Sequence, residues 1–167
     1  MRILEVCVNL DGGGIDRYLY NYCSRIKDIH FDFAIVDNKE NGILEEPLLK
    51  QGCKIFRVPR LSSGFKKNYD VLHTIMTENR YDAVHVHLGY KGFWALKCAK
   101  DCGIKIRIVH AHIANVPENR VEKAIRFFLT KITKYYATDL AACGIDAAKW
   151  VWGVHIPKEK FLFIIML

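Results

Sequence analysis

Three consecutive glycines stand near the start of the chain, in the segment NLDGGGID at 9–16. Glycine lets a backbone bend sharply and approach a ligand closely. A helical pattern follows, and the N-terminus of a helix offers free N–H groups and a positive dipole end to an anion. We therefore predict a phosphate site formed by Gly12, Gly13, Gly14 and Asp16. The alternative is an ordinary tight turn between a strand and a helix.

Two common phosphate motifs do not fit this loop. A Walker loop needs Gly-Lys-Ser/Thr, which is absent here. In the dinucleotide fingerprint GxGxxG, Gly12 and Gly14 match, but Arg17 stands at the third glycine. We expect its large side chain to obstruct close packing of the helix on the strand. Asp37 stands where a ribose-binding acid would lie, so NAD binding remains an alternative.

Two pairs of histidines, His85 with His87 and His110 with His112, are each spaced two residues apart. Side chains at this spacing on a strand share one face of the sheet. We expect His87 and His112 to bind a sugar hydroxyl or a phosphate, or to accept a proton. His85 and His110 fit a core position equally well. Two such pairs could hold a metal, but the pattern shows no carboxylate to complete the set, so we predict none.

The segment 118–137 combines a broad apolar stripe with several cations. One interpretation is a surface helix that packs on the sheet and leaves its charges in water. The other is contact with an anionic bilayer, in which aromatic side chains enter the headgroup region. The cations predicted to face the membrane are Lys123, Arg126, Lys131 and Lys134. No nucleic-acid-binding motif is present, so we expect no nucleic acid partner.

Short β-rich runs and helical patterns alternate along the chain. Strands are predicted at 2–9, 31–37, 54–58, 82–87, 104–110 and 138–143. Helices are predicted at 15–27, 43–51, 66–79, 90–102 and 118–137. This alternation is typical of βαβ units and predicts an α/β fold, a Rossmann-like parallel sheet with helices on both faces. Ligands of such sheets bind beyond the carboxyl ends of the strands, where the glycine loop and the histidines fall.

The chain has 167 residues, of which 51% are hydrophobic and 26% charged, a balance that excludes a largely disordered chain. The net charge of +7 favours an anionic partner. Six cysteines without a CxxC pair predict free thiols rather than disulfides or a zinc site. No run approaches the ~18 apolar residues of a membrane span, and the N-terminal segment is typical of a strand rather than a signal peptide. We expect a cytoplasmic protein.

Four segments resemble, in order and spacing, characteristic motifs of family 4 glycosyltransferases of the bacterial capsular, exopolysaccharide and lipopolysaccharide type. They are GGGIDRYLYNY, DAVHVHLGY, KIRIVHAHIAN and AACGIDAAKWVWG, which span most of 1–153. The resemblance implies one half of a GT-B fold in a hexosyltransferase. Such an enzyme transfers a sugar from a nucleotide sugar to a polysaccharide or lipid-linked acceptor with retention of configuration. It needs no metal and no cofactor.

The resemblance also implies roles for individual residues. His112 would contact the transferring sugar as the catalytic residue, and the glycine loop would approach the donor phosphates. His87 and His110 would lie on the acceptor side. Two departures are visible: Asp16 replaces the usual glutamate, and the segment beginning at Ala142 lacks the usual serine.

The resemblance further implies a division of the chain. Residues 1–153 correspond to the Rossmann-like N-terminal domain, and 154–167 form an apolar tail that we expect to be truncated or irregular. The donor-binding domain is absent, so we expect an acceptor-binding half that is inactive or weak alone. One alternative is a non-catalytic subunit, peripheral on the inner face of the membrane, that partners a separate donor-domain chain. Another is a stand-alone nucleotide-binding Rossmann domain.

Overall fold

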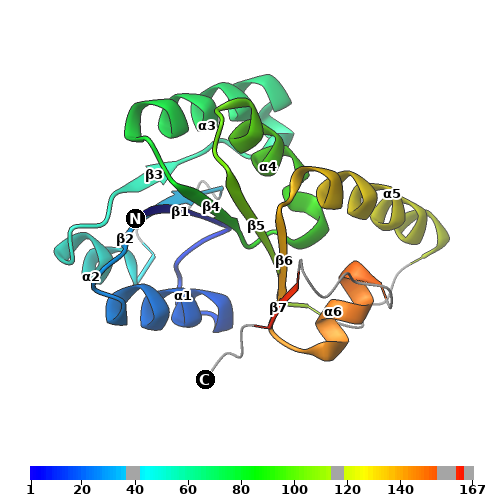
Figure 1. Cartoon of the computed structure of the whole chain (residues 1–167), viewed down its shortest axis with the longest axis horizontal. Helices are drawn as coiled ribbons and strands as arrows, with labels where there is room; N and C mark the ends of the chain where they lie inside the picture. The colour runs from blue at the N-terminus through cyan, green and yellow to red at the C-terminus, as the bar shows by residue number, and fades with distance from the viewer. Residues whose placement is uncertain (37–41, 114–118, 154–160, 164–167) are drawn as a thin grey trace.

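Parallel strands form one sheet in the order β3-β2-β1-β4-β5-β6-β7 (Figure 1). The computed structural model describes residues 1–36, 42–113, 119–153 and 161–163. Every neighbouring pair of strands in this part of the chain is parallel. The strands are β1 (Arg2–Cys7), β2 (His30–Ile35), β3 (Ile55–Arg57), β4 (Ala83–Val86), β5 (Ile106–Ala111), β6 (Asp139–Ala142) and β7 (Phe161–Phe163).

The strand order reverses between β1 and β4. The chain runs outward from β1 to β3, returns to β4 beside β1, and then runs outward on the other side. A parallel sheet with such a reversal has a crevice at the carboxyl ends of the two central strands. This crevice is where the predicted site residues should meet.

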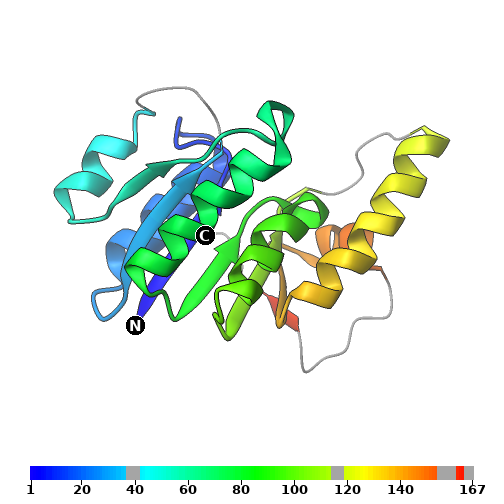
Figure 2. The same ribbon diagram turned by 90° about the horizontal axis from the view of Figure 1, so that it is seen from above.

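Helices cover both faces of the sheet (Figures 1 and 2). They are α1 (Gly14–Arg25), α2 (Glu45–Lys50), α3 (Phe65–Asn79), α4 (Phe93–Asp101), α5 (Arg120–Tyr136) and α6 (Ile145–Trp152), with 3-10 turns η1 (Leu61–Ser63) and η2 (Gly89–Gly92). No helix in the described ranges is long and apolar enough to cross a membrane.

Alternate side chains of the strands enter two separate cores. Val6 and Val86 pack with residues of α3, α4 and α6 on one face, whereas Cys7 and Phe33 pack with residues of α1 and α2 on the other. Because both faces are covered, the central strands are apolar on both sides. The predicted Rossmann-like α/β fold is confirmed.

The structure adds two elements to those predicted. Helix α6 lies in a segment that the sequence analysis used only as a motif, although its buried residues Ala147, Ala148, Val151 and Trp152 recur at helical spacing. Strand β7 lies within the expected tail and pairs with β6, Leu140 opposite Phe161. Asp37, and the residues of the tail at 154–160 and 164–167, lie outside the described residues.

A buried aspartate joins the amino ends of the strands. The carboxylate of Asp32, in β2, is fully buried. It accepts hydrogen bonds from Lys54 N (2.7 Å), Tyr81 Oη (2.8 Å) and Arg2 Nη2 (2.7 Å). Burial alone would raise the pKa of Asp32, but these donors outweigh it and hold the pKa below its usual value.

Replacing Asp32 by Asn should therefore destabilise the protein by about 3 kcal/mol, because it removes a buried charge that Arg2 and Tyr81 need. Since the folded-state pKa is lowered, this contribution is present above the unfolded-state pKa and is lost as pH falls through the folded-state pKa. Urea unfolding of both proteins between neutral and acidic pH measures it. The two curves should converge at low pH; a constant difference would contradict this account.

Candidate functional site

The glycine loop leads directly into α1, with Gly13 as the N-cap residue. Asp16 Oδ2 accepts hydrogen bonds from Gly12 N and Gly13 N, both at 3.1 Å. The chain's own carboxylate thus takes two of the N–H groups that were expected to meet a phosphate. Gly14 and Ile15, the first helical residues, still carry N–H groups that the helix cannot satisfy. The N-terminus of α1 therefore has fewer free N–H groups for an anion than predicted.

Arg17 does not have the expected effect on packing. Its side chain is exposed and its Nε donates to Gly12 O at 2.9 Å. The guanidinium therefore closes the loop from outside and does not separate α1 from the sheet. The expectation that Arg17 obstructs helix packing was wrong, because this residue faces away from the strands.

The positions of the loop differ in how strictly they require glycine. Gly12 has φ +94°, and a Cβ there would lie 2.7 Å from Ile43 Cδ1. Gly14 has no atom within 4 Å of an added Cβ. Gly12 is therefore the position of this loop at which both the backbone conformation and the neighbouring side chain require glycine.

Gly12→Ala should destabilise the protein by about 1–2 kcal/mol because of the left-handed conformation and the contact with Ile43. Gly14→Ala is the matched control and should change the free energy of unfolding by less than ~0.5 kcal/mol. Urea titration followed by circular dichroism measures both. Equal losses for the two variants would contradict the assigned loop geometry.

The histidines converge on a buried glutamate. Glu5, in β1, lies opposite His85 of β4 in the sheet register. Its Oε2 is 2.7 Å from His87 Nε2 and 3.2 Å from His85 Nδ1. Both histidines therefore share one face of the sheet, as their spacing predicted, and it is the face that α1 covers.

A chain of hydrogen bonds runs from Glu5 toward the crevice. His87 Nδ1 lies 2.9 Å from His112 Nε2. If His87 Nε2 carries the proton donated to Glu5, its Nδ1 must accept, and His112 Nε2 must donate. The buried carboxylate thus selects the tautomer of His87 and, through it, that of His112.

Burial keeps these rings neutral. Desolvation, followed by repulsion from neighbouring histidines, lowers the pKa of His87 to about 4 and that of His112 to about 3. The same causes lower the pKa of His110 further. Burial of Glu5 opposes its ionisation, but interactions with His85 and His87 prevail and lower its pKa. At neutral pH His87, His110 and His112 are therefore neutral imidazoles near a carboxylate, and they can accept and donate hydrogen bonds.

Tyr18 of α1 covers the cluster. Its ring centroid lies 5.8 Å from that of His110 and 6.1 Å from that of His112. His110 is fully buried behind the other rings. His110 therefore does not line the crevice.

A pocket of about 740 Å³ opens beside this cluster. His87 and His112 form part of its wall, with Val8 and Ile15 from either side of the glycine loop. Most of the remaining wall is apolar and comes from the ends of β4 and β5, from α5 and from α6. It includes Tyr90, Trp94, Ile113, Ile125 and Trp150.

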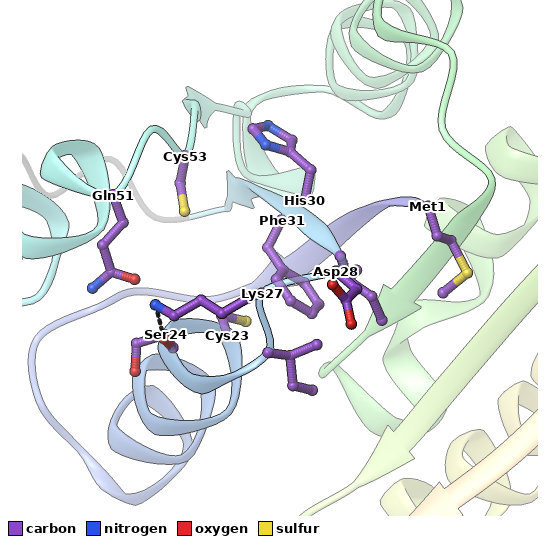
Figure 3. A pocket seen from close by; sticks show the side chains of 11 residues that line it. Met1, Cys23, Ser24, Lys27, Asp28, His30, Phe31, Gln51 and Cys53 are labelled. Carbon is purple, nitrogen blue, oxygen red and sulfur yellow. Dashed lines mark hydrogen bonds between the residues drawn. The ribbon is translucent and has the colours of Figure 1, made fainter.

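A second pocket, of about 350 Å³, lies at the opposite, amino edge of the sheet (Figure 3). Met1, Lys27 and His30 contribute to it, and Lys27 Nζ donates to Ser24 O at 2.9 Å. None of the predicted site residues lines it. The pocket at the carboxyl edge is therefore the candidate site.

The structure brings His87 and His112 together behind and at the pocket wall and places the glycine loop beside them. The side chain of His87 has no exposed surface, so of the two only His112 presents its ring to the pocket. Sequence reasoning missed Glu5 and Tyr18. The signal for Glu5 was a single charge inside the apolar run ILEVCV, since a parallel strand buried on both faces has no solvated side for it. His85, His87 and His110 are the described residues best placed to share a metal ion, with one ring nitrogen of each within 4.8 Å of the others.

The four predicted cations of α5 do not share one environment. Arg126 Nη1 donates to Trp150 O at 2.8 Å, and its guanidinium lies over the Trp150 ring. Lys134 Nζ donates to Trp152 O, and burial lowers its pKa. Lys123 and Lys131 remain on the exposed surface. Two of the cations thus hold α6 against α5.

The apolar stripe of α5 is not packed on the sheet. Val121, Ile125 and Phe128 are 67%, 51% and 63% exposed. The buried side chains of α5 are Thr130 and Thr133. Figure 2 shows the first turns of α5 extending beyond the sheet. The interpretation of an apolar face packed on the sheet was wrong for this half of the helix.

The chain is similar to a putative glycosyltransferase, EpsF of Bacillus subtilis, with 26% identity over 167 residues. The match covers 95% of this chain and 43% of EpsF, so the chain spans less than half the length of that relative. No protein-family model matches the chain.

Solved structures agree on the fold. HepE of Anabaena in complex with UDP has a TM-score of 0.69 at 13% identity. The match covers 99% of this chain and 44% of the HepE chain. The lipopolysaccharide outer core galactosyltransferase WaaB has a TM-score of 0.68 at 14% identity, with 97% and 44% covered. The fold is one half of a GT-B fold. UDP-GlcNAc 2-epimerase of Neisseria meningitidis, bound to UDP-GlcNAc, shares it with a TM-score of 0.67 at 14% identity, with 98% and 46% covered.

Proposed function

We propose that this chain is the acceptor-binding half of a retaining glycosyltransferase. In the complete enzyme, a sugar would pass from a nucleotide sugar to a polysaccharide or lipid-linked acceptor. The observation that carries the proposal is the pocket at the carboxyl edge of the sheet. It combines the partly exposed imidazole of His112 with a long apolar wall, which suits an acceptor that has both hydroxyl groups and a hydrocarbon part.

Within this proposal, His112 contacts the transferring sugar. Its Nε2 shares a hydrogen bond with His87 Nδ1, so its ring orientation is held before any ligand arrives. The N–H groups of Gly14 and Ile15 approach the donor phosphates from the end of α1. Asp16 acts indirectly by holding Gly12 and Gly13 in place. The similarity to EpsF supports the reaction class.

Acceptor binding can be measured on this chain by the fluorescence of Trp94 and Trp150, which line the pocket. A polyprenyl-phosphate-linked disaccharide should change this fluorescence in a saturable way. Ile113→Asp, at a residue that is 55% exposed, should weaken binding at least ~10-fold by placing a charge in the apolar wall. Leu49→Asp, at a residue 53% exposed on α2, is the matched control and should bind normally.

The same titration separates the alternatives. Saturable binding of NAD or a free nucleotide, without binding of the lipid-linked acceptor, would contradict the proposal and favour a stand-alone nucleotide-binding domain. An acceptor response that is equal in the two aspartate variants would show that the pocket does not bind the acceptor.

We also propose that the exposed face of α5 contacts an anionic membrane surface, which is where a lipid-linked acceptor would lie. Val121, Phe127 and Phe128 are all more than 60% exposed on this helix. Lys131 Nζ lies 4.4 Å from the centre of the Phe127 ring. A helix that offers aromatic side chains beside cations is suited to the interface of a bilayer.

Reversing the charge of Lys123 and Lys131 together should weaken binding to vesicles that contain phosphatidylglycerol. Each cation near the surface contributes about 1 kcal/mol, so the loss should be roughly 30-fold or more. Lys50→Glu with Lys66→Glu makes the same change in net charge at exposed sites on other helices and should have a smaller effect. Equal losses for the two double variants in a sedimentation assay would rule out a specific role for α5.

A further inference from the structure

The histidine cluster contains more buried polar atoms than its own hydrogen bonds satisfy. Glu5 Oε1, His85 Nε2 and both ring nitrogens of His110 are buried and have no hydrogen-bond partner among the described residues. An unsatisfied buried polar atom costs about 1–3 kcal/mol. Such an array is costly for a protein core unless it binds something.

The donor set is one that transition metals prefer. His85, His87 and His110 can each direct one ring nitrogen to a common point, with all three atoms within 4.8 Å of one another. Tetrahedral zinc holds its ligand atoms about 3.4 Å apart, so small rotations of the rings suffice. Glu5 Oε2 already lies 2.7 Å from His87 Nε2 and 3.2 Å from His85 Nδ1, which supplies the carboxylate that the sequence pattern did not show.

We propose that His85, His87 and His110 form a binding site for one ion of the zinc class, with the carboxylate of Glu5 beside it. The three imidazoles offer three of the four ligands of a tetrahedral ion, and Glu5 supplies a negative charge next to two of them. The ion joins β4 and β5 at the carboxyl half of the sheet.

Proton positions balance without release of a proton. The ion occupies His87 Nε2, and the single proton of His87 then lies on Nδ1, where it is donated to His112 Nε2. The proton of His112 moves to its own Nδ1. Ligating histidines commonly donate their second N–H in this way, so His112 becomes the group that orients a ligand of the ion.

The cluster lies directly behind the wall of the pocket of about 740 Å³, to which His87 and His112 contribute. The imidazole of His87 has no exposed surface there. Tyr18 closes the cluster from the side of α1, with its ring 6.5 Å from that of His87. The ion is thus held behind the pocket wall, where it does not obstruct an acceptor.

The test is a titration of the chelator-treated protein with Co²⁺, which reports coordination by its visible absorption, and with Zn²⁺ by calorimetry. We expect one ion per chain, the intense d–d absorption of a tetrahedral complex, and no thiolate-to-metal charge transfer from the free cysteines. Glu5→Gln should weaken binding at least ~10-fold. His73→Gln, on α3 at the other face of the sheet, is the control and should bind normally.

Imidazole ¹⁵N shifts of the wild-type protein with and without Zn²⁺ identify the ligands without any substitution, so the test stands even if a variant fails to fold. Shifts in His85, His87 and His110 support the site. The proposal is overturned if the wild-type protein binds neither metal at micromolar concentration. Thiolate charge transfer, or binding that His73→Gln weakens as much as Glu5→Gln, also overturns it. None of these outcomes depends on glycosyl transfer.

Discussion

A carboxylate buried in β1, next to the central strand of the parallel sheet, constrains the rest of this site. Glu5 has no exposed surface and no solvated side on which to place its charge. Donors must therefore come from the next strand of the sheet, and β4 supplies them as His85 and His87. Because His87 is engaged by the carboxylate on one side, only its other nitrogen reaches His112. The orientation of His112 at the pocket thus depends on a carboxylate in β1, which β4 separates from β5.

Much of the architecture could be predicted from the sequence because the strands are short apolar runs separated by helical patterns. The positions of the histidines on one face followed from their spacing, since alternate side chains of a strand share a face. Glu5 was not predicted as a site residue. A charge within ILEVCV is nevertheless a signal, because a strand that is covered on both sides has no solvated face for it. Residue spacing shows which side chains share a face, but it does not show which strand will lie beside them. That depends on the order of strands in the sheet.

Helical periodicity does not predict which side chains of α5 are buried. The stripe that includes Val121, Ile125 and Phe128 has the spacing of a core-facing surface, yet these side chains are exposed. The helix is fixed instead through Thr133, which donates to Tyr90 O at 2.7 Å, and through Arg126 and Lys134, which reach α6. An amphipathic pattern predicts that the apolar face of a helix is covered, but it does not identify what covers that face. In this chain the sheet does not cover Val121, Ile125 and Phe128.

The carboxylate of Asp16 determines how the loop would meet an anion. It occupies two N–H groups of the turn and lies beside the remaining ones. Within the proposed function, a donor phosphate near the end of α1 would be attracted by the helix and repelled by this side chain at once. These opposed forces would shorten its stay, so the side chain that keeps the loop rigid would also favour rapid exchange of the nucleotide.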